Sequence, residues 1–305
     1  MTISSFPNGF ANGVTVRGVP LLTAYPNKIF WVDSTTGSNS GKGTFDRPFA
    51  TIDYAIGRCT ANKGDIIAVK AGHTETVSTA SGIDFDVAGV AVIGMGVGSM
   101  RPTINISATA GFVDFSAANC FLMNVLITGG IDAVVKAVLI DAADCTLENV
   151  EVRDVTGQVT DGILTTANAD RAKILKYRHN GATAAGTNAG IAIVGGSDIE
   201  ITIDRMDGNF AVGGIDVRTT ATTNLLVRDV SYFRTRNAAD IFIVDTITGS
   251  TGQIGPNIYL RLNDNAANIT ESCTGATFVY HQPISVVNNA GEVGMQINIT
   301  ASTDA

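Results

Sequence analysis

The chain has 305 residues, a net charge of −8 and only 16% charged residues. Nucleic-acid binding depends on clustered Lys and Arg, and this acidic chain has no basic stripe, so we expect no DNA or RNA partner. No apolar run approaches the roughly 18 residues of a membrane span, and we expect no membrane association.

Residues 1–27 are polar and punctuated by glycine. They have neither a basic start nor a continuous apolar core, so they do not form a secretion signal. We expect an N-terminal arm that is separate from the repeats that follow. The alternative is a tail folded against the first coil.

Residues 28–78 lead into the repeats. A Gly/Asn/Ser-rich stretch precedes Pro-Phe-Ala-Thr-Ile at 48–52, and Gly-Asp-Ile-Ile-Ala-Val follows at 64–69. We expect a helix over residues 48–58, because a proline near a helix start sacrifices no helical hydrogen bond. This helix would cover the strand edges at the end of the stack, which otherwise invite pairing with other chains.

A nine-residue register then recurs about every 25 residues. Asn-Cys-Phe-Leu-Met-Asn-Val-Leu-Ile at 119–127 returns as Asp-Cys-Thr-Leu-Glu-Asn-Val-Glu-Val at 144–152, and fainter copies start at 170, 198 and 224. Such a period is typical of solenoids and propellers. The short Val/Ile/Leu/Thr alternations, broken by Gly, Asn and Asp, favour strands with tight corners over helices.

A coil of this length has room for three short strands and three corners, which is one turn of a parallel β-helix. The predicted fold class is all-β, a right-handed single-stranded parallel β-helix of about seven coils with a short N-terminal capping helix. Further coils are expected around residues 89–93 and 256–260. The inward columns would be Leu122, Leu147, Ile201 and Val227 in one slot, and Val125, Val150 and Val230 in another.

The coils would occupy residues 79–268, after which the rhythm changes. Strand-like segments follow at 269–272, 278–280, 284–287 and 295–300, with Asn-Asn-Ala-Gly turn chemistry at 288–291. We expect residues 269–305 to form a C-terminal β cap or an oligomerisation segment.

Residues 28–78, together with the coil pattern that follows, resemble the pectin-lyase-like superfamily of right-handed parallel β-helices. That superfamily contains lyases, hydrolases and epimerases as well as non-enzymatic phage spikes, fibres and capsid attachments, so the resemblance implies the fold and not the chemistry. The opening arm is similar to the N-terminal arms of bacteriophage virion proteins. The likeness to phage β-helix proteins implies a parallel homotrimer.

Cys120 and Cys145 fall in the same slot of adjacent coils, where their Cα atoms would lie about 5 Å apart. A disulfide is therefore geometrically possible. Stacked buried thiols are the alternative that we favour, because a chain without an export signal folds in reducing cytosol.

Positions nine or ten past each register start would form one outer ridge. Asp154 and Asp207 would lie two coils, or roughly 10 Å, apart on it, near the carboxylate gap of an inverting glycosidase, with His179 between them. The alternative is a structural role, since Asp is common at corners. No catalytic residue is favoured, and these three are the candidates if the chain is an enzyme.

Other chemistry is less well supported by the sequence. A polysaccharide lyase would need a calcium cluster beside a basic residue. The nearest approach is Asp198, Asp204 and Asp207 with Arg205, and it does not form such a site because alternation sends residues 204 and 205 to opposite faces. A small aromatic patch of Tyr177, Tyr232 and Phe233 is conceivable, although core packing is favoured. His73 and Glu75 lack a second ligand pair, so we expect no metal and no cofactor.

These observations favour a non-enzymatic bacteriophage virion protein, either a capsid decoration or a short head-fibre protein assembled in the host cytoplasm. The arm would bind phage capsid or tail proteins. Decoration is favoured over tail-spike duty, because about seven coils without large inserted loops leave little room for a receptor groove. The alternative is a tail-spike-like protein that binds or cleaves a bacterial surface polysaccharide. The predicted anchor residues of the arm are Phe6, Phe10, Val14, Val16 and Leu21.

Overall fold

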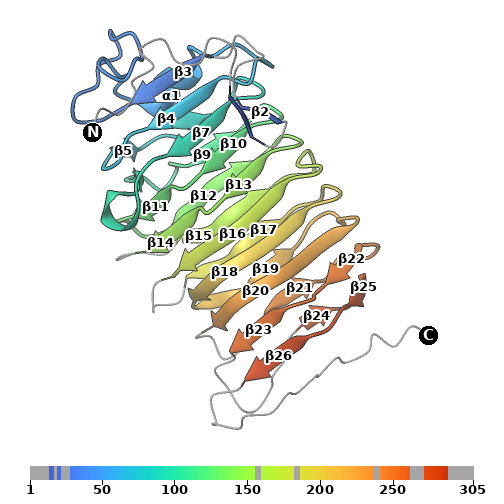
Figure 1. Cartoon of the computed structure of the whole chain (residues 1–305). Helices are drawn as coiled ribbons and strands as arrows, with labels where there is room; N and C mark the ends of the chain where they lie inside the picture. The colour runs from blue at the N-terminus through green and yellow to red at the C-terminus, as the bar shows by residue number, and fades with distance from the viewer. Residues whose placement is uncertain are drawn as a thin grey trace, which may run out of the picture.

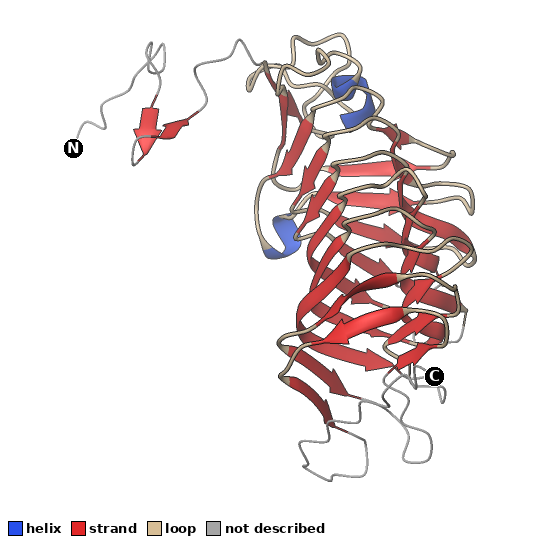
Figure 2. Ribbon diagram, turned by 90° about the vertical axis from the view of Figure 1, so that its right-hand side faces the viewer, coloured by secondary structure: helices blue, strands red, loops and turns tan. Residues whose placement is uncertain are grey.

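The computed structural model describes residues 14–16, 19–21, 28–154, 159–181, 186–235, 241–261 and 271–287. From residue 28 the chain winds into a rod of stacked coils whose strands run across the rod (Figure 1, Figure 2). Within the rod, strands pair in parallel with strands of the next coil. The predicted parallel β-helix of about seven coils is confirmed.

Three rows of strands form the walls of the rod. The first row is β3 (Ile29–Val32), β4 (Ile66–Val69), β7 (Ala91–Gly94), β10 (Phe121–Met123), β13 (Thr146–Glu148), β16 (Lys173–Asn180), β18 (Glu200–Gly208), β20 (Leu225–Thr235), β22 (Thr251–Ile254) and β25 (Thr277–Tyr280). The second row is β5 (Thr74–Val77), β8 (Thr103–Ile106), β11 (Leu126–Gly129), β14 (Glu151–Asp154), β23 (Ile258–Arg261) and β26 (Ile284–Val287). Strands β16, β18 and β20 are long enough to belong to both rows.

The third row is a separate eight-stranded sheet. Its strands are β6 (Ile83–Asp84), β9 (Val113–Phe115), β12 (Val134–Ile140), β15 (Val159–Thr165), β17 (Thr187–Ile193), β19 (Phe210–Val217), β21 (Ile243–Asp245) and β24 (Glu271–Cys273). The segment 28–78 contributes β3, β4 and β5 to the stack itself, ahead of the predicted coils. Strands β25 and β26 stack on β22 and β23, so the described C-terminal residues continue the rod.

The repeat seen in the sequence marks one corner of each coil. Corner residues have a left-handed backbone, with φ between +55° and +62°, at Asn119, Asp144, Asp198 and Asn224. Asn and Asp tolerate this conformation better than most residues with a Cβ. In the third copy of the repeat the corner residue is Arg171, and Lys173 pairs with Thr146. The start predicted at residue 170 is therefore one residue too early.

The predicted inward columns are confirmed. One column runs without interruption through buried side chains at Leu122, Leu147, Ile174, Ile201, Val227 and Ile254. A second contains Val125, Val150, Tyr177, Ile203, Val230 and Ile258, all buried. Stacking side chains of similar size in each column lets neighbouring coils share one continuous core.

Aromatic side chains of the core lie opposite glycines of the third row. A Cβ on Gly162 would lie 2.4 Å from the Tyr177 hydroxyl, and a Cβ on Gly214 would lie 2.3 Å from the Phe233 ring. The interior therefore accommodates a large ring in one wall by removing the side chain from the wall that it faces.

A short helix caps the N-terminal end. Helix α1 (Ile52–Ile56) begins after the N-cap Thr51, later than the predicted start at Pro48. The residues before it are extended, because the Phe49 N–H donates to the Trp31 carbonyl at 2.8 Å. Glu75 of β5 accepts the Ile52 N–H at 2.8 Å and so joins the cap to the coils.

The arm contains one described element, a hairpin of β1 (Val14–Val16) and β2 (Val19–Leu21) that forms a two-stranded sheet of its own. The predicted anchors Phe6 and Phe10 lie outside the described residues. For Val14, Val16 and Leu21 the structure describes the backbone alone.

Candidate functional site

The histidine predicted on the outer ridge lies in the core instead. His179 is fully buried, its Nδ1 lies 3.1 Å from the Tyr177 hydroxyl, and its ring lies 5.2 Å from that of Phe210. It pairs with the buried residues Val152 and Met206. The prediction was wrong because the third copy of the repeat starts at residue 171, one residue later than expected. A one-residue shift turns each side chain to the other face of the strand.

The two predicted carboxylates do not face each other. Asp207 shares an outward column with Arg153, and its Oδ2 accepts a hydrogen bond from Arg205 at 3.1 Å. Asp154 stands one position further along its strand, and its Oδ1 accepts the Val159 N–H at 3.2 Å. Neighbouring positions on a strand point to opposite faces, so Asp154, His179 and Asp207 do not converge on one site.

Acid pH should destabilise the protein through His179. Burial lowers the pKa of His179 to about 4, whereas an unfolded histidine titrates near 6.5. Between these values the unfolded chain binds a proton that the folded chain does not. The free energy of unfolding should therefore fall by about 3 kcal/mol as the pH drops from 7 to 4.

Unfolding titrations of the native chain and of His179→Gln across this range measure that contribution. The stability advantage of the native chain should shrink toward acid pH. The exposed His281 provides the control for the substitution itself, as His281→Gln makes the same change outside the core. Parallel pH profiles for the native chain and His179→Gln would contradict the prediction.

Several buried carboxylates are neutralised by arginines. Glu151 accepts hydrogen bonds from Arg101, from Arg153 Nε at 2.8 Å and from Asn180 at 3.2 Å. Burial opposes ionisation of Glu151, but the two guanidinium groups outweigh it and hold its pKa below the usual value. This carboxylate is therefore a fixed anion within a network, not a proton acceptor in reserve.

A second network lies on the third row. Arg218 donates to Asp161 and, at 3.1 Å, to Asp216, and both carboxylates are buried. Burial raises the pKa of both aspartates although Arg218 opposes the shift. Arg218 thus compensates two desolvated charges at once.

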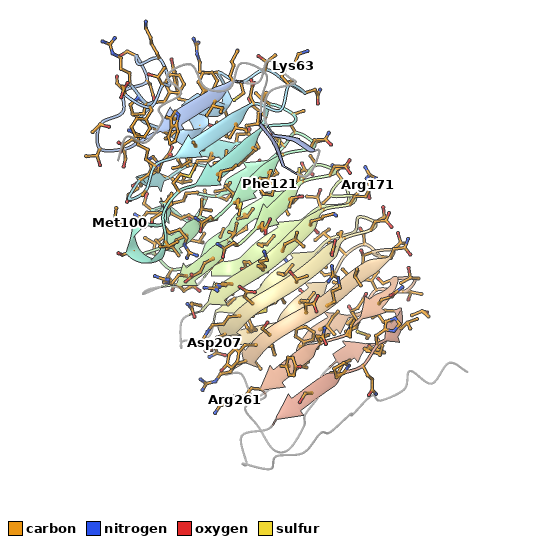
Figure 3. All side chains as sticks on the ribbon, in the orientation of Figure 1. Lys63, Met100, Phe121, Arg171, Asp207 and Arg261 are labelled. Atoms are coloured by element: carbon orange, nitrogen blue, oxygen red, sulfur yellow. The ribbon has the colours of Figure 1, made fainter. Side chains whose placement is uncertain are left out.

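One cluster on the outer surface combines cations with aromatic rings. Its members project from β18, β20 and β23, and we refer to them as the Arg–Tyr patch: Arg205, Tyr232, Arg234, Tyr259 and Arg261. The guanidinium of Arg205 lies 4.9 Å from the Tyr232 ring centroid, and Tyr259 is 50% exposed. Figure 3 places Asp207 and Arg261 along one edge of the rod and Arg171 along the other.

A second repeat in the sequence, separate from the repeat of the corner residues, could have predicted this patch. Tyr-Phe-Arg at 232–234 returns as Tyr-Leu-Arg at 259–261, and Arg234 pairs with Arg261 on adjacent coils. Alternation buries Phe233 and Leu260 and turns the flanking Tyr and Arg outward. Of the predicted aromatic patch, Tyr177 and Phe233 belong to the core and Tyr232 alone faces outward.

The patch has a positive character. Arg205 is paired with Asp207, but in the part of the chain that the structure describes no ion pair involves Arg234 or Arg261. Guanidinium groups bind carboxylates in a bidentate manner, and tyrosine rings offer an apolar face with a polar edge. The arrangement suits a flat, anionic ligand lying along the rod.

The other candidates serve the fold. His73 Nε2 lies 3.2 Å from the Glu75 carboxylate that accepts the Ile52 N–H of the capping helix. Cys120 and Cys145 are free thiols at adjacent, buried positions. Among the described residues, no three His, Cys, Asp or Glu side chains are grouped to hold a metal ion. Over the same residues, no helix has the length and apolar character to cross a bilayer.

The fold defines the chain as a parallel β-helix protein. No protein-family profile matches the chain, and no curated protein matches it in sequence. Among solved structures it is similar to a rhamnogalacturonan lyase, with 14% identity, 89% of this chain and 90% of that chain covered, and a TM-score of 0.40. It is also similar to a GH136 lacto-N-biosidase from Eubacterium ramulus, with 13% identity, 86% and 67% coverage, and a TM-score of 0.28. Similarity at this level informs neither the site nor the activity.

Proposed function

We propose that the chain is a non-enzymatic structural protein of a bacteriophage virion, a capsid decoration or short head-fibre protein whose rod projects from the particle. The observation that carries the proposal is the state of the candidate catalytic groups. His179 is sealed in the core, Asp207 accepts a hydrogen bond from Arg205, and Asp154 accepts the Val159 N–H. The three candidate side chains therefore do not present an exposed acid and base on one ridge.

The virion setting is supported by the N-terminal arm. The arm precedes the first strand of the rod, and its similarity to phage docking arms implies a contact with a capsid or tail protein. Its apolar side chains Phe6 and Phe10 would supply that contact, since burying two aromatic rings contributes several kcal/mol. The resemblance to phage β-helix proteins also implies three parallel copies.

Deleting residues 1–27 is expected to abolish binding to phage particles and to leave the rod folded. Binding should be lost because the arm makes the contact with the particle. The rod should stay folded because its core is formed by the side chains of the coils. Co-sedimentation of the full chain and of the truncated chain with purified particles measures binding, and circular dichroism confirms the fold. Phe6→Ser with Phe10→Ser should reproduce the loss. A folded, truncated rod that still binds particles would refute the docking role.

A second candidate function is supported by the Arg–Tyr patch. A tail-spike-like protein that binds an anionic bacterial surface polysaccharide would use Arg234 and Arg261 for carboxylates and Tyr259 for a sugar ring. Successive coils repeat every 5 Å or so, which spaces these side chains along a linear chain of sugars. Polysaccharide binding would require no acid or base.

Arg234→Gln with Arg261→Gln is expected to weaken binding of a carboxylate-bearing polysaccharide by about 30-fold or more, since two charged contacts are lost. Calorimetry with purified capsular polysaccharide from the host strain measures the change. The control, Arg171→Gln with Lys176→Gln, removes two positive charges outside the patch, Arg171 from the opposite edge and Lys176 from within β16, and should have little effect. Equal losses in both variants would indicate nonspecific attraction and remove this candidate.

A further inference from the structure

The outward surface of the first strand row is apolar at the N-terminal end of the rod. Strands β3, β4, β7 and β10 each contribute two outward side chains, aligned by register into two columns. We call this surface the N-terminal apolar face: Ile29, Ile66, Ala91 and Phe121 in one column, and Trp31, Ala68, Ile93 and Met123 in the other. The positions between the columns, such as Ile67 and Val92, point inward and are fully buried.

This face is only partly covered by the rod's own side chains, with Ala68 the one buried member. Ile29 is 50% exposed, and Phe45, whose ring lies 5.0 Å from that of Trp31, is 57% exposed. Most of the remaining members, Phe121 and Ile93 among them, are partly exposed. Contiguous apolar patches of this kind on soluble proteins mark contacts with other proteins.

Beyond β10 the same surface becomes polar, and its charges neutralise one another. The first column continues as Thr146, Lys173 and Glu200. The basic side chains of these coils pair with acidic side chains of the same surface: Arg171 with Asp144, Lys173 with Glu200, Lys176 with Glu148, and Arg228 with Glu200. The surface is thus apolar at one end and charge-balanced along the rest.

We infer that this surface, with the N-terminal apolar face at one end of it, packs against a second copy of the chain. Two copies that each carry a net charge of −8 repel, unless they meet through a surface whose charges are balanced. The first row of ten strands is about 43 Å long and about 13 Å wide over four residues, on the order of 600 Å². That area approaches the roughly 800 Å² per partner of a standard interface.

The inference deepens the proposed function and rests on it for the expectation that copies of the chain associate; what it adds is the surface through which they meet. The N-terminal arm also joins the rod at Ile29, the first member of the face. Association through this face would therefore bring the arms of neighbouring copies together at one end of the rod. Several weak arm contacts would then act in concert on a particle.

The mass of the full chain in solution, measured by light scattering and sedimentation equilibrium, tests the inference. The native chain should be a dimer or larger at micromolar concentration. Ile93→Lys with Phe121→Lys should raise the dissociation constant by about 30-fold or more, because two charges would be buried at the contact. The matched control is Leu139→Lys with Leu164→Lys, which adds the same charges to a partly exposed outward column of the third row.

A monomeric native chain, or an oligomer whose mass is unchanged in the face variant, would overturn the inference. If the lysine variant misfolds by circular dichroism, Phe121→Thr replaces it, since Thr146 already occupies the next position of that column. A monomeric chain whose face variant loses particle binding would assign the face to a virion protein and likewise overturn self-association. Loss of particle binding on deletion of residues 1–27 is independent of all these outcomes, so the two proposals fail separately.

Discussion

Arg218→Met is expected to lower the free energy of unfolding by about 3 kcal/mol, because it leaves the buried carboxylates of Asp161 and Asp216 without their common partner. The value lies at the lower end of the range for a broken buried ion pair, since the arginine side chain is itself 29% exposed. Urea denaturation followed by circular dichroism measures the loss.

The same substitution at an exposed ion pair provides the control. Arg171 pairs with Asp144 at 2.7 Å, but both side chains are exposed, so Arg171→Met should cost at most about 1 kcal/mol. Adding Asp161→Asn and Asp216→Asn to Arg218→Met should recover part of the loss, because it removes the two uncompensated charges. Equal effects of the two Arg→Met changes, with no recovery, would show that Arg218 does not compensate these charges.

The Arg218 variant should also respond to pH with a definite sign. Burial already raises the pKa of Asp161 and Asp216 in the folded chain, and removing the guanidinium raises both further. A folded-state pKa above the unfolded value means that the folded chain binds protons more readily. The loss in free energy of unfolding caused by Arg218→Met should therefore be largest at neutral pH and should shrink as the pH falls.

Phe233→Ala is expected to lower the free energy of unfolding by about 3–5 kcal/mol. The ring is fully buried between Phe210 and Phe242, with centroid distances of 6.1 and 5.0 Å. It also fills the space opposite Gly214, which has no side chain to move into the cavity. Thermal and urea unfolding measure the change.

The neighbouring residue provides a matched control in the same strand. Tyr232 points outward, so Tyr232→Ala should cost about 1 kcal/mol or less, chiefly through its lost contact with Arg205. Replacing Gly214 by a larger residue should also lower the free energy of unfolding, since its side chain would collide with the Phe233 ring. Similar losses for Phe233→Ala and Tyr232→Ala would mean that the ring at 233 does not support the core.

The sequence by itself determined the rod. Left-handed corners need residues such as Asn119 and Asp144, and the columns through Leu122 and Val125 need aliphatic side chains, so both leave a periodic trace in the sequence. The capping helix was predictable from Pro48 and the residues that follow it. Its start was not, because the pairing of Phe49 with Val32 keeps the preceding residues extended, and that contact is made across the fold.

The tertiary structure alone decided which side chains meet at the surface. Counting from the corner placed His179 on the outer ridge, but Arg171 replaces the usual Asn or Asp at that corner, and a single residue of offset turned His179 into the core. The Arg–Tyr patch and the N-terminal apolar face arise in the same way, from residues in different coils that only stacking brings together. Local chemistry fixes the period of a β-helix, whereas its surface depends on the register between coils, which is set by packing over the whole stack.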